Sequence, residues 1–488
     1  MSEFLFEEGC CCGRRVFLQT VGAAAGGMAL GAGGLVAADG PAALPAPKKS
    51  PAVVRVVFLY PPSALLRKKG YWSWPGSSFD AEGHQKQYTA KLQEIAKRLD
   101  MRVVADEKPI CDDAGVAALL SSVKQAKPDA LLLVPMYKGF WGLVTKIVQG
   151  SQVPNVIFAT WAVLFIEHTR QLYRKPGVYL INSPENLEAV EYGLRMVRTA
   201  RWMREARIVN VAGVGVREGT APPFGSQIRN VPRARFVEEL ARVDLAAARK
   251  LADSFRTGAK EIVEPTEQDI LDAAKGYFAL KRILEVEHGD ALMLQCLEGL
   301  QRPEGKQALH SPACMGFMCL RDEGIVAACQ ADLESAITMM LFQQLFGKPG
   351  FEHNLGVDTE RNEYFASHCT SASKMRGVGT PPEPYVLRSH NEAGWGCVPR
   401  VLMTPGEDVT IAQYVAGAKT PKMCVYSGKI VRVPPPSGCR TNVVTTINEL
   451  DDVCLLGSNP MGHMCLCYGN HAKRLRAFCQ LYGIQAVS

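Results

Sequence analysis

The chain has 488 residues, of which 47% are hydrophobic and 21% are charged, and this balance is typical of a soluble globular protein with more than one domain. It excludes a disordered chain, a collagen-like chain and a polytopic membrane protein. The formal net charge of +7 is mild for this length, and no long run of Lys and Arg occurs, so we do not expect a nucleic-acid-binding surface.

Residues 1–38 have the pattern of a twin-arginine signal peptide. The pair Arg14-Arg15 precedes a soft apolar stretch that ends in small residues near position 38. The alternative is a chance Arg-Arg pair before an apolar run. Residues 39–51 are proline-rich and predict a linker. We therefore expect export to the periplasm or an equivalent compartment, with no stable membrane span after the signal is removed.

Strands and helices alternate through the next 300 residues, which is typical of βαβ units and parallel sheets. We predict two Rossmann-like open parallel-sheet domains: an N-terminal α/β domain over 52–175 and a middle α/β domain over 176–360. Apolar β-branched runs predict strands at 52–60, 101–104, 130–134 and 155–159 in the first domain, and at 178–181, 208–211, 290–294 and 325–329 in the second. Helical periodicity predicts helices at 84–99, 113–125, 141–149, 186–203, 246–255, 267–287 and 332–346.

The sequence texture changes after residue 349. Short alternating segments separated by Pro and Gly predict a small antiparallel β-rich, barrel-like C-terminal domain over 361–488. The expected strands are 364–367, 385–389, 409–414, 424–433, 442–447 and 464–468, followed by a helix at 471–482 and a last strand at 484–487.

Common motifs for nucleotide and hydrolase chemistry are missing. The glycines near 213–219 do not fit a dinucleotide fingerprint, and no P-loop, GxSxG or HExxH motif occurs. The thirteen cysteines from Cys111 onward contain no C-x-x-C pair, so a zinc ribbon or a thioredoxin-type site is unsupported. We expect Cys465 and Cys467 to share one face of a strand, as core residues rather than metal ligands. Metal or cofactor-free chemistry is therefore favoured.

Two positions could carry that chemistry. Asp332 stands where an apolar strand becomes a helix, and ligands of open α/β sheets bind beyond the carboxyl ends of strands. The alternative is that Asp332 is only a helix N-cap, for which Asp is a preferred residue. His463 ends a polar loop before a strand that looks buried, and histidine is the commonest neutral metal ligand. A purely structural histidine is the alternative.

Residues 329–347, together with 462–471 and 476–484, resemble segments of the L-fucose isomerase / L-arabinose isomerase family. The resemblance is spread thinly over about 55–488. It implies two α/β domains and a β-rich domain, a divalent metal held by Asp332 and His463, with Mn²⁺ expected and Mg²⁺ the alternative, and a monosaccharide substrate. It also implies a homo-oligomer.

The resemblance gives further site residues and two departures. Segments around His368, Arg388 and His390 resemble stretches that line the cleft of relatives, so these residues and Gln330 are expected to bind substrate. Relatives usually carry an acid where Gln330 stands. The second catalytic carboxylate has no clean match, and Glu298 is the nearest candidate for base and metal ligand; an exposed loop acid is the alternative.

The expected function is therefore a metal-dependent aldose–ketose isomerase that acts by proton transfer through a cis-enediol, with Asp332 and Glu298 as catalytic carboxylates. Because Gln330 replaces the usual acid and the second carboxylate has no clean match, the catalytic site could be degenerate. The main alternative is an exported, non-catalytic carbohydrate-binding protein on the same scaffold, with Trp72, Trp74 and Trp395 stacking on sugar rings. A redox protein using the cysteines is a third hypothesis.

Overall fold

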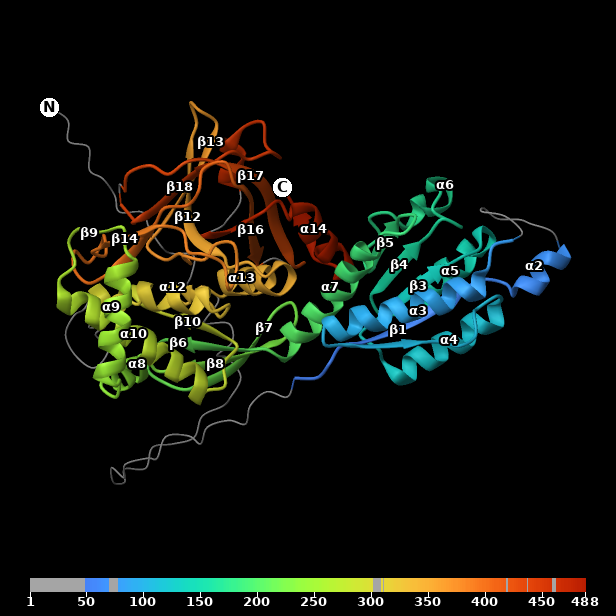
Figure 1. Ribbon diagram of the computed structural model, residues 1–488, viewed down its shortest axis with the longest axis horizontal. Coiled ribbons are helices and arrows are strands. Elements are labelled where there is room, and N and C mark those ends of the chain that lie inside the picture. The colour runs from blue at the N-terminus through green and yellow to red at the C-terminus, as the bar shows by residue number, and fades with distance from the viewer. Residues whose placement is uncertain are drawn as a thin grey trace, which may run out of the picture.

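The computed structural model describes residues 49–69, 78–301, 309, 311–417, 420–436, 438–458 and 462–488. The predicted signal peptide, most of the predicted linker, Trp72 and Trp74 lie outside these residues. Figure 1 shows three regions: one sheet with its helices at the right, a second at the lower left, and a β-rich region above the second. Within the described ranges, none of the helices combines the length and the apolar character that crossing a bilayer requires.

The first sheet has five strands in the order β2-β1-β3-β4-β5, and all neighbours pair in parallel. Its central strands are buried throughout, because helices cover a parallel sheet. The strands are β1 (Val53–Leu59), β2 (Arg102–Ala105), β3 (Ala130–Pro135), β4 (Asn155–Ala159) and β5 (Val178–Asn182). The helices are α2 (Ser63–Lys69), α3 (Ala81–Arg98), α4 (Asp113–Ala126), α5 (Trp141–Gly150) and α6 (Ile166–Thr169), with short 3₁₀ turns η1 (Lys138–Phe140) and η2 (Arg170–Leu172).

Strand β5 corrects one sequence-based expectation. We expected 178–181 to open the second α/β series, but β5 pairs in parallel with β4 over Asn155–Ala159 and is the edge strand of the first sheet. The second sheet begins only after the long helix α7 (Leu187–Glu205), which Figure 1 shows running between the two regions. Strand propensity identifies β5 but not the sheet it joins, because that depends on which neighbour offers a free edge.

The second sheet is mixed rather than purely parallel, in the order β11-β10-β6-β8-β7. Strand β7 is antiparallel to β8, because a short turn joins the two and allows only a hairpin. The strands are β6 (Arg207–Val211), β7 (Arg217–Ala221), β8 (Ser226–Val231), β10 (Ala291–Leu294) and β11 (Val326–Cys329). The helices are α8 (Ala234–Leu240), α9 (Leu245–Gly258), α10 (Glu267–Val286), α11 (Leu297–Gln301), α12 (Cys314–Asp322) and α13 (Leu333–Phe346).

Six antiparallel strands close into a barrel, which confirms the barrel-like expectation. The order is β16-β19-β12-β13-β18-β17, and pairing of β16 with β17 closes the ring, so the barrel has no exposed edge within these six strands. Strand β20 (Gln485–Val487) adds in parallel to β17. The six strands are β12 (Phe351–Asp358), β13 (Glu363–His368), β16 (Asp408–Val415), β17 (Lys422–Arg432), β18 (Thr441–Thr445) and β19 (Met464–Tyr468).

Three details differ from the expected β-rich region. The unexpected strand β12 joins the barrel although it lies within 176–360. Strands β14 (Tyr385–Arg388) and β15 (Val398–Val401) lie outside the barrel, in a small sheet with β9 (Glu261–Ile262). After the 3₁₀ turn η3 (Val453–Ser458), helix α14 (Ala472–Leu481) reaches the first sheet, where the Gln480 side chain donates to the Val178 carbonyl.

The barrel places one of its faces against the middle domain. Side chains alternate along a strand, so Met464 and Leu466 pack inside the barrel with Phe351. Cys465 and Cys467 point the other way and share a core with the apolar side of α13. As α13 follows β11 directly, the carboxyl end of β11 lies beside β12 and β19. The candidate site lies at this junction.

Candidate metal centre

Asp332, Glu352 and His463 converge where the middle domain meets the barrel. One donor atom of each lies within 4.8 Å of those of the other two. His463 Nδ1 is 2.7 Å from Asp332 Oδ2 and 3.9 Å from Glu352 Oε1. The exposed fractions of the Asp332, Glu352 and His463 side chains are 9%, 0% and 2%. The structure thus brings together the two residues singled out in the sequence and adds a second carboxylate.

Asp332 is both a helix cap and a member of this cluster. Its Oδ1 accepts the backbone N–H groups of Glu334 and Ser335 at 3.0 and 3.1 Å, which caps α13. Its Oδ2 faces His463. The two interpretations of the sequence were therefore not exclusive, because each oxygen has its own role. The helix holds Oδ1, and this leaves Oδ2 fixed in direction.

The backbone before Asp332 is strained. Gln330 and Ala331 have φ angles of 53° and 57°, in the left-handed region that non-glycine residues rarely adopt. Each such residue costs about 1–2 kcal/mol. The pair turns the chain sharply between the end of β11 and the start of α13. Strain of this kind is found where surrounding structure fixes a functional side chain, here Asp332.

Glu352 has a similar division between its two oxygens. Its Oε2 accepts from Arg321 Nη2 at 3.0 Å and from the Cys329 backbone N–H at 2.9 Å. Its Oε1 has no hydrogen-bond partner among the described residues, although the side chain is fully buried. Burial raises the pKa of Glu352, while His463 and Arg321 oppose that shift. A buried carboxylate oxygen without a hydrogen-bond donor is unusual and points to a group that would complete the site.

The donor set fits a divalent cation. Adjacent ligands of a cation bound at about 2.1 Å lie about 3 Å apart in octahedral geometry, and opposite ligands about 4 Å apart. The His463–Asp332 and His463–Glu352 distances of 2.7 and 3.9 Å are close to this range. Two carboxylates and an imidazole are hard or intermediate ligands, which suit Mn²⁺ or Mg²⁺. The cation would also give Glu352 Oε1 the partner that it lacks.

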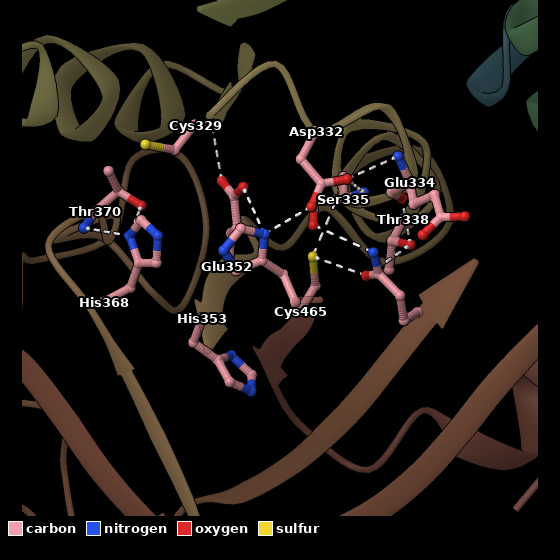
Figure 2. A network of polar contacts seen from close by, with 12 residues as sticks. Cys329, Asp332, Glu334, Ser335, Thr338, Glu352, His353, His368, Thr370 and Cys465 are labelled. Atoms are coloured by element: carbon pink, nitrogen blue, oxygen red, sulfur yellow. Dashed lines mark hydrogen bonds and ion pairs between the residues drawn. The ribbon is translucent and has the colours of Figure 1, made fainter. Parts of the chain in front are cut away.

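Two further histidines are close to the cluster, with different orientations. His368, at the end of β13, has its ring centroid 5.3 Å from that of His463. Its Nδ1 accepts the Thr370 N–H, so the neutral ring carries its proton on Nε2, and burial lowers its pKa well below the usual value. His353 points away from the carboxylates in Figure 2, and its Nε2 contacts the Tyr364 hydroxyl at 2.6 Å. His353 is therefore part of the barrel interior.

The prediction that Glu298 joins this cluster is wrong. Glu298 lies at the start of α11, its side chain is 54% exposed, and it forms an ion pair with Arg233 at 3.0 Å. The only group of metal-ligating side chains found among the described residues contains Glu352 instead. Glu298 is thus an exposed acid, as the alternative held, but it lies at the start of a short helix rather than in a loop.

Glu298→Gln is expected to leave Mn²⁺ affinity and any isomerase activity within about twofold of the parent. Gln keeps the length of Glu and can still accept a hydrogen bond from Arg233, and residue 298 is not one of the three side chains that converge. Isothermal titration with Mn²⁺ and a ketose assay check this. A tenfold or larger loss of affinity would return Glu298 to the site.

Of the other predicted substrate-binding residues, Arg388 and His390 have partners outside the cluster, and Gln330 lies in the turn that precedes Asp332. Arg388 forms a two-point ion pair with Glu264. His390 is buried, and its Nδ1 accepts the Ala393 N–H at 3.3 Å. Burial, with Arg440 nearby, lowers the pKa of His390 to about 4. Gln330 forms the strained turn before Asp332. Among the four, the structure places His368 beside His463.

Comparison with known proteins indicates which class of reaction this site could serve. No protein-family model matches the chain. The chain is 21% identical to the sulfoquinovose isomerase of Priestia aryabhattai over 423 residues, which cover 80% of this chain and 92% of that protein. It is 20% identical to the sulfoquinovose isomerase of Alkalicoccus urumqiensis over 343 residues, which cover 66% and 74%. These relatives are sugar isomerases. The similarity supports that class and does not single out the L-fucose or L-arabinose enzymes.

Proposed function

We propose that this protein is a metal-dependent aldose–ketose sugar isomerase whose cation is held by Asp332, Glu352 and His463. The observation that carries the proposal is the convergence of these three side chains from three separate segments of the chain. The similarity to sulfoquinovose isomerases over 92% and 74% of their length supports the reaction class. The cation expected is Mn²⁺, with Mg²⁺ the alternative.

The contacts of the cluster indicate a role for each side chain around a bound cation. When bound, a divalent cation polarises a sugar carbonyl and neutralises charge that develops on the neighbouring oxygens. Arg321 and the Cys329 N–H hold Glu352 in place, and the α13 N-terminus holds Asp332. Rigid anchoring of this kind keeps the ligand oxygens in position, so little reorganisation is needed as charge develops.

Proton transfer between adjacent carbons requires a carboxylate that substrate can reach. The Asp332 side chain is 9% exposed and that of Glu352 is 0% exposed, so we assign the transfer to Asp332. We assign to His368, whose ring proton is on Nε2, the donation of a hydrogen bond to a sugar hydroxyl. This assignment keeps Asp332 as a catalytic residue and leaves Glu298 without a role.

A non-catalytic carbohydrate-binding protein is the less favoured function. That hypothesis was favoured by Gln330 and the missing base, and it named three aromatics that could stack on sugar rings. Of these, Trp395 packs against the core of the middle domain, and Trp72 and Trp74 lie outside the described residues. The relatives that cover most of the chain are named isomerases. A buried two-carboxylate cluster also has no evident purpose in sugar binding alone, because burying like charges together is unfavourable.

We further propose that the protein is exported by the twin-arginine route and forms a homo-oligomer. The first proposal depends on the pattern in residues 1–38, and the second on the family resemblance. Neither changes the assignment of the cluster.

Removal of divalent cations is expected to abolish isomerisation. Protein treated with chelator and dialysed should convert aldose to ketose at least a hundredfold more slowly, and Mn²⁺ should restore the rate, because the charge of the developing enediolate would otherwise be unmatched. The assay uses sulfoquinovose, D-glucose, L-fucose and L-arabinose, with ketose measured by chromatography. Sulfoquinovose tests the activity named for the relatives, and D-glucose tests whether its sulfonate matters.

Two results would contradict this function. Full activity after complete removal of metal, verified by elemental analysis, would separate catalysis from the cluster. Tight binding of an aldose by Mn²⁺-loaded protein without any ketose would select the carbohydrate-binding alternative.

A further inference from the structure

Cys296 and Cys329 have their thiols in direct contact, with the two Sγ atoms 3.1 Å apart. Cys329 is the last residue of β11, and Cys296 lies two residues beyond Leu294, which pairs with Cys329 across β10 and β11. Both residues are buried, at 6% and 4% exposed, and both are free thiols. A disulfide needs a sulfur separation of about 2.05 Å, so an approach of about 1 Å would close the bond.

The same pair touches the candidate metal centre through the backbone. The Cys329 N–H donates to Glu352 Oε2 at 2.9 Å, a bond that Figure 2 shows from the end of β11 to the carboxylate. Two strained residues, Gln330 and Ala331, then connect Cys329 to Asp332. Movement of Cys329 would therefore act on both carboxylates of the cluster.

We propose that Cys296 and Cys329 form a reversible disulfide, and that the disulfide form binds a divalent cation more weakly than the dithiol form. The second half of this inference rests on the proposed function, because it concerns the same cluster. Closure draws Cys329 toward β10, which lengthens its hydrogen bond to Glu352. The left-handed turn transmits the same shift to Asp332. Packed interiors do not absorb such shifts freely, since their side chains are close-packed.

The chemistry balances with a peroxide as oxidant. The thiolate of one cysteine attacks hydrogen peroxide, which breaks the O–O bond and yields a sulfenic acid and hydroxide, and the hydroxide takes up a proton to become water. The second thiol attacks the sulfenic sulfur, forms the S–S bond and releases a second water. Two thiols and one peroxide thus give one disulfide and two waters. A peroxide suits this pair because it is small enough to reach thiols that are nearly buried.

A peptide map of the full chain tests the bond without reference to activity. Metal-free protein is oxidised with hydrogen peroxide, freed of oxidant, alkylated and digested, and mass spectrometry should find the peptides of Cys296 and Cys329 linked. A dithiol reductant should restore two free thiols. Absence of this link, with both thiols alkylated after oxidation, would overturn the proposal.

Titration with Mn²⁺ tests the effect on the cluster. The oxidised protein should bind Mn²⁺ at least threefold more weakly than the reduced protein, and Cys296→Ala should bind it equally in both conditions. Cys424→Ala is the matched control, because Cys424 is also a buried thiol, at 2% exposed, but lies on β17. This variant should keep both the link and the change in affinity.

The outcomes separate this inference from the proposed function. If reduced protein binds no Mn²⁺, the proposed function fails, while the peptide map still judges the disulfide. If the link forms and the affinity for Mn²⁺ is the same in both redox states, the coupling of this pair to the cluster is refuted while the metal site stands.

Discussion

Asp332→Asn is expected to weaken Mn²⁺ binding by at least a hundredfold, about 2.7 kcal/mol, and to reduce kcat/KM by at least as much. The change removes one of two carboxylate charges that face the cation, together with the group assigned to proton transfer. It preserves the cap of α13, since Asn and Asp are about equally good N-caps. The free energy of unfolding of the metal-free protein should therefore change by less than about 0.5 kcal/mol. Urea denaturation and titration calorimetry measure the two effects separately.

The controls use the two roles of Asp332. Asp332→Ala should lose the same affinity and also about 1 kcal/mol of stability, because the cap is lost. Asp112 is an N-cap of the same kind, accepting from the Gly115 N–H at 2.8 Å at the start of α4. Asp112→Ala should lose similar stability and keep full Mn²⁺ affinity. Normal Mn²⁺ binding by Asp332→Asn would show that the cluster is only structural.

The sequence indicated Asp332 and His463 because each stands at a boundary between elements. Asp332 interrupts an apolar run just as helical periodicity begins, and His463 precedes an alternating apolar segment. Such boundaries can be recognised in the sequence. The proximity of Asp332 and His463 cannot, because the two residues are 131 positions apart and meet only when the barrel docks on the middle domain. The family resemblance supplied that link.

The sequence did not indicate Glu352 as a site residue, and the reason is physical. It is the second residue of a strand that was not predicted, between Phe351 and His353, so no element boundary was expected there. Alternation places it on the outer face of the barrel, where an acid would ordinarily be solvated and unremarkable. Only the docking of α13 and β11 against this face buries it. The strand also carries His353, Asn354 and Asp358, so its sequence does not show whether the face that holds Glu352 is solvated or buried.

The strands themselves were more predictable than their partners. Strand β4 matches its expected bounds at 155–159, because a short apolar run specifies a buried strand. The edge strand β7 was missed, since four of its five residues are exposed and give no apolar pattern. Sheet membership, as for β5, depends on long-range pairing that local propensity does not encode.

Glu352→Gln is expected to lower both Mn²⁺ affinity and stability, unlike the substitution at Asp332. Affinity should fall at least a hundredfold, because Gln offers no charge to the cation. The metal-free protein should also lose about 3 kcal/mol of unfolding free energy, since the Arg321 side chain, only 1% exposed, would remain buried without its anion. Urea denaturation in the presence of chelator measures this loss.

A double variant separates the two losses. Replacing both charges, as Arg321→Met with Glu352→Gln, should recover more than half of the lost stability, because removing a buried ion pair completely is less damaging than breaking it. Mn²⁺ affinity should stay as low as in the single variant. The matched control is the exposed pair of Lys429 with Asp408, whose side chains are 57% and 56% exposed. Asp408→Asn should change stability by less than about 0.5 kcal/mol. Recovery of Mn²⁺ binding in the double variant would mean that Glu352 serves only to balance Arg321, and that the cation site is built without it.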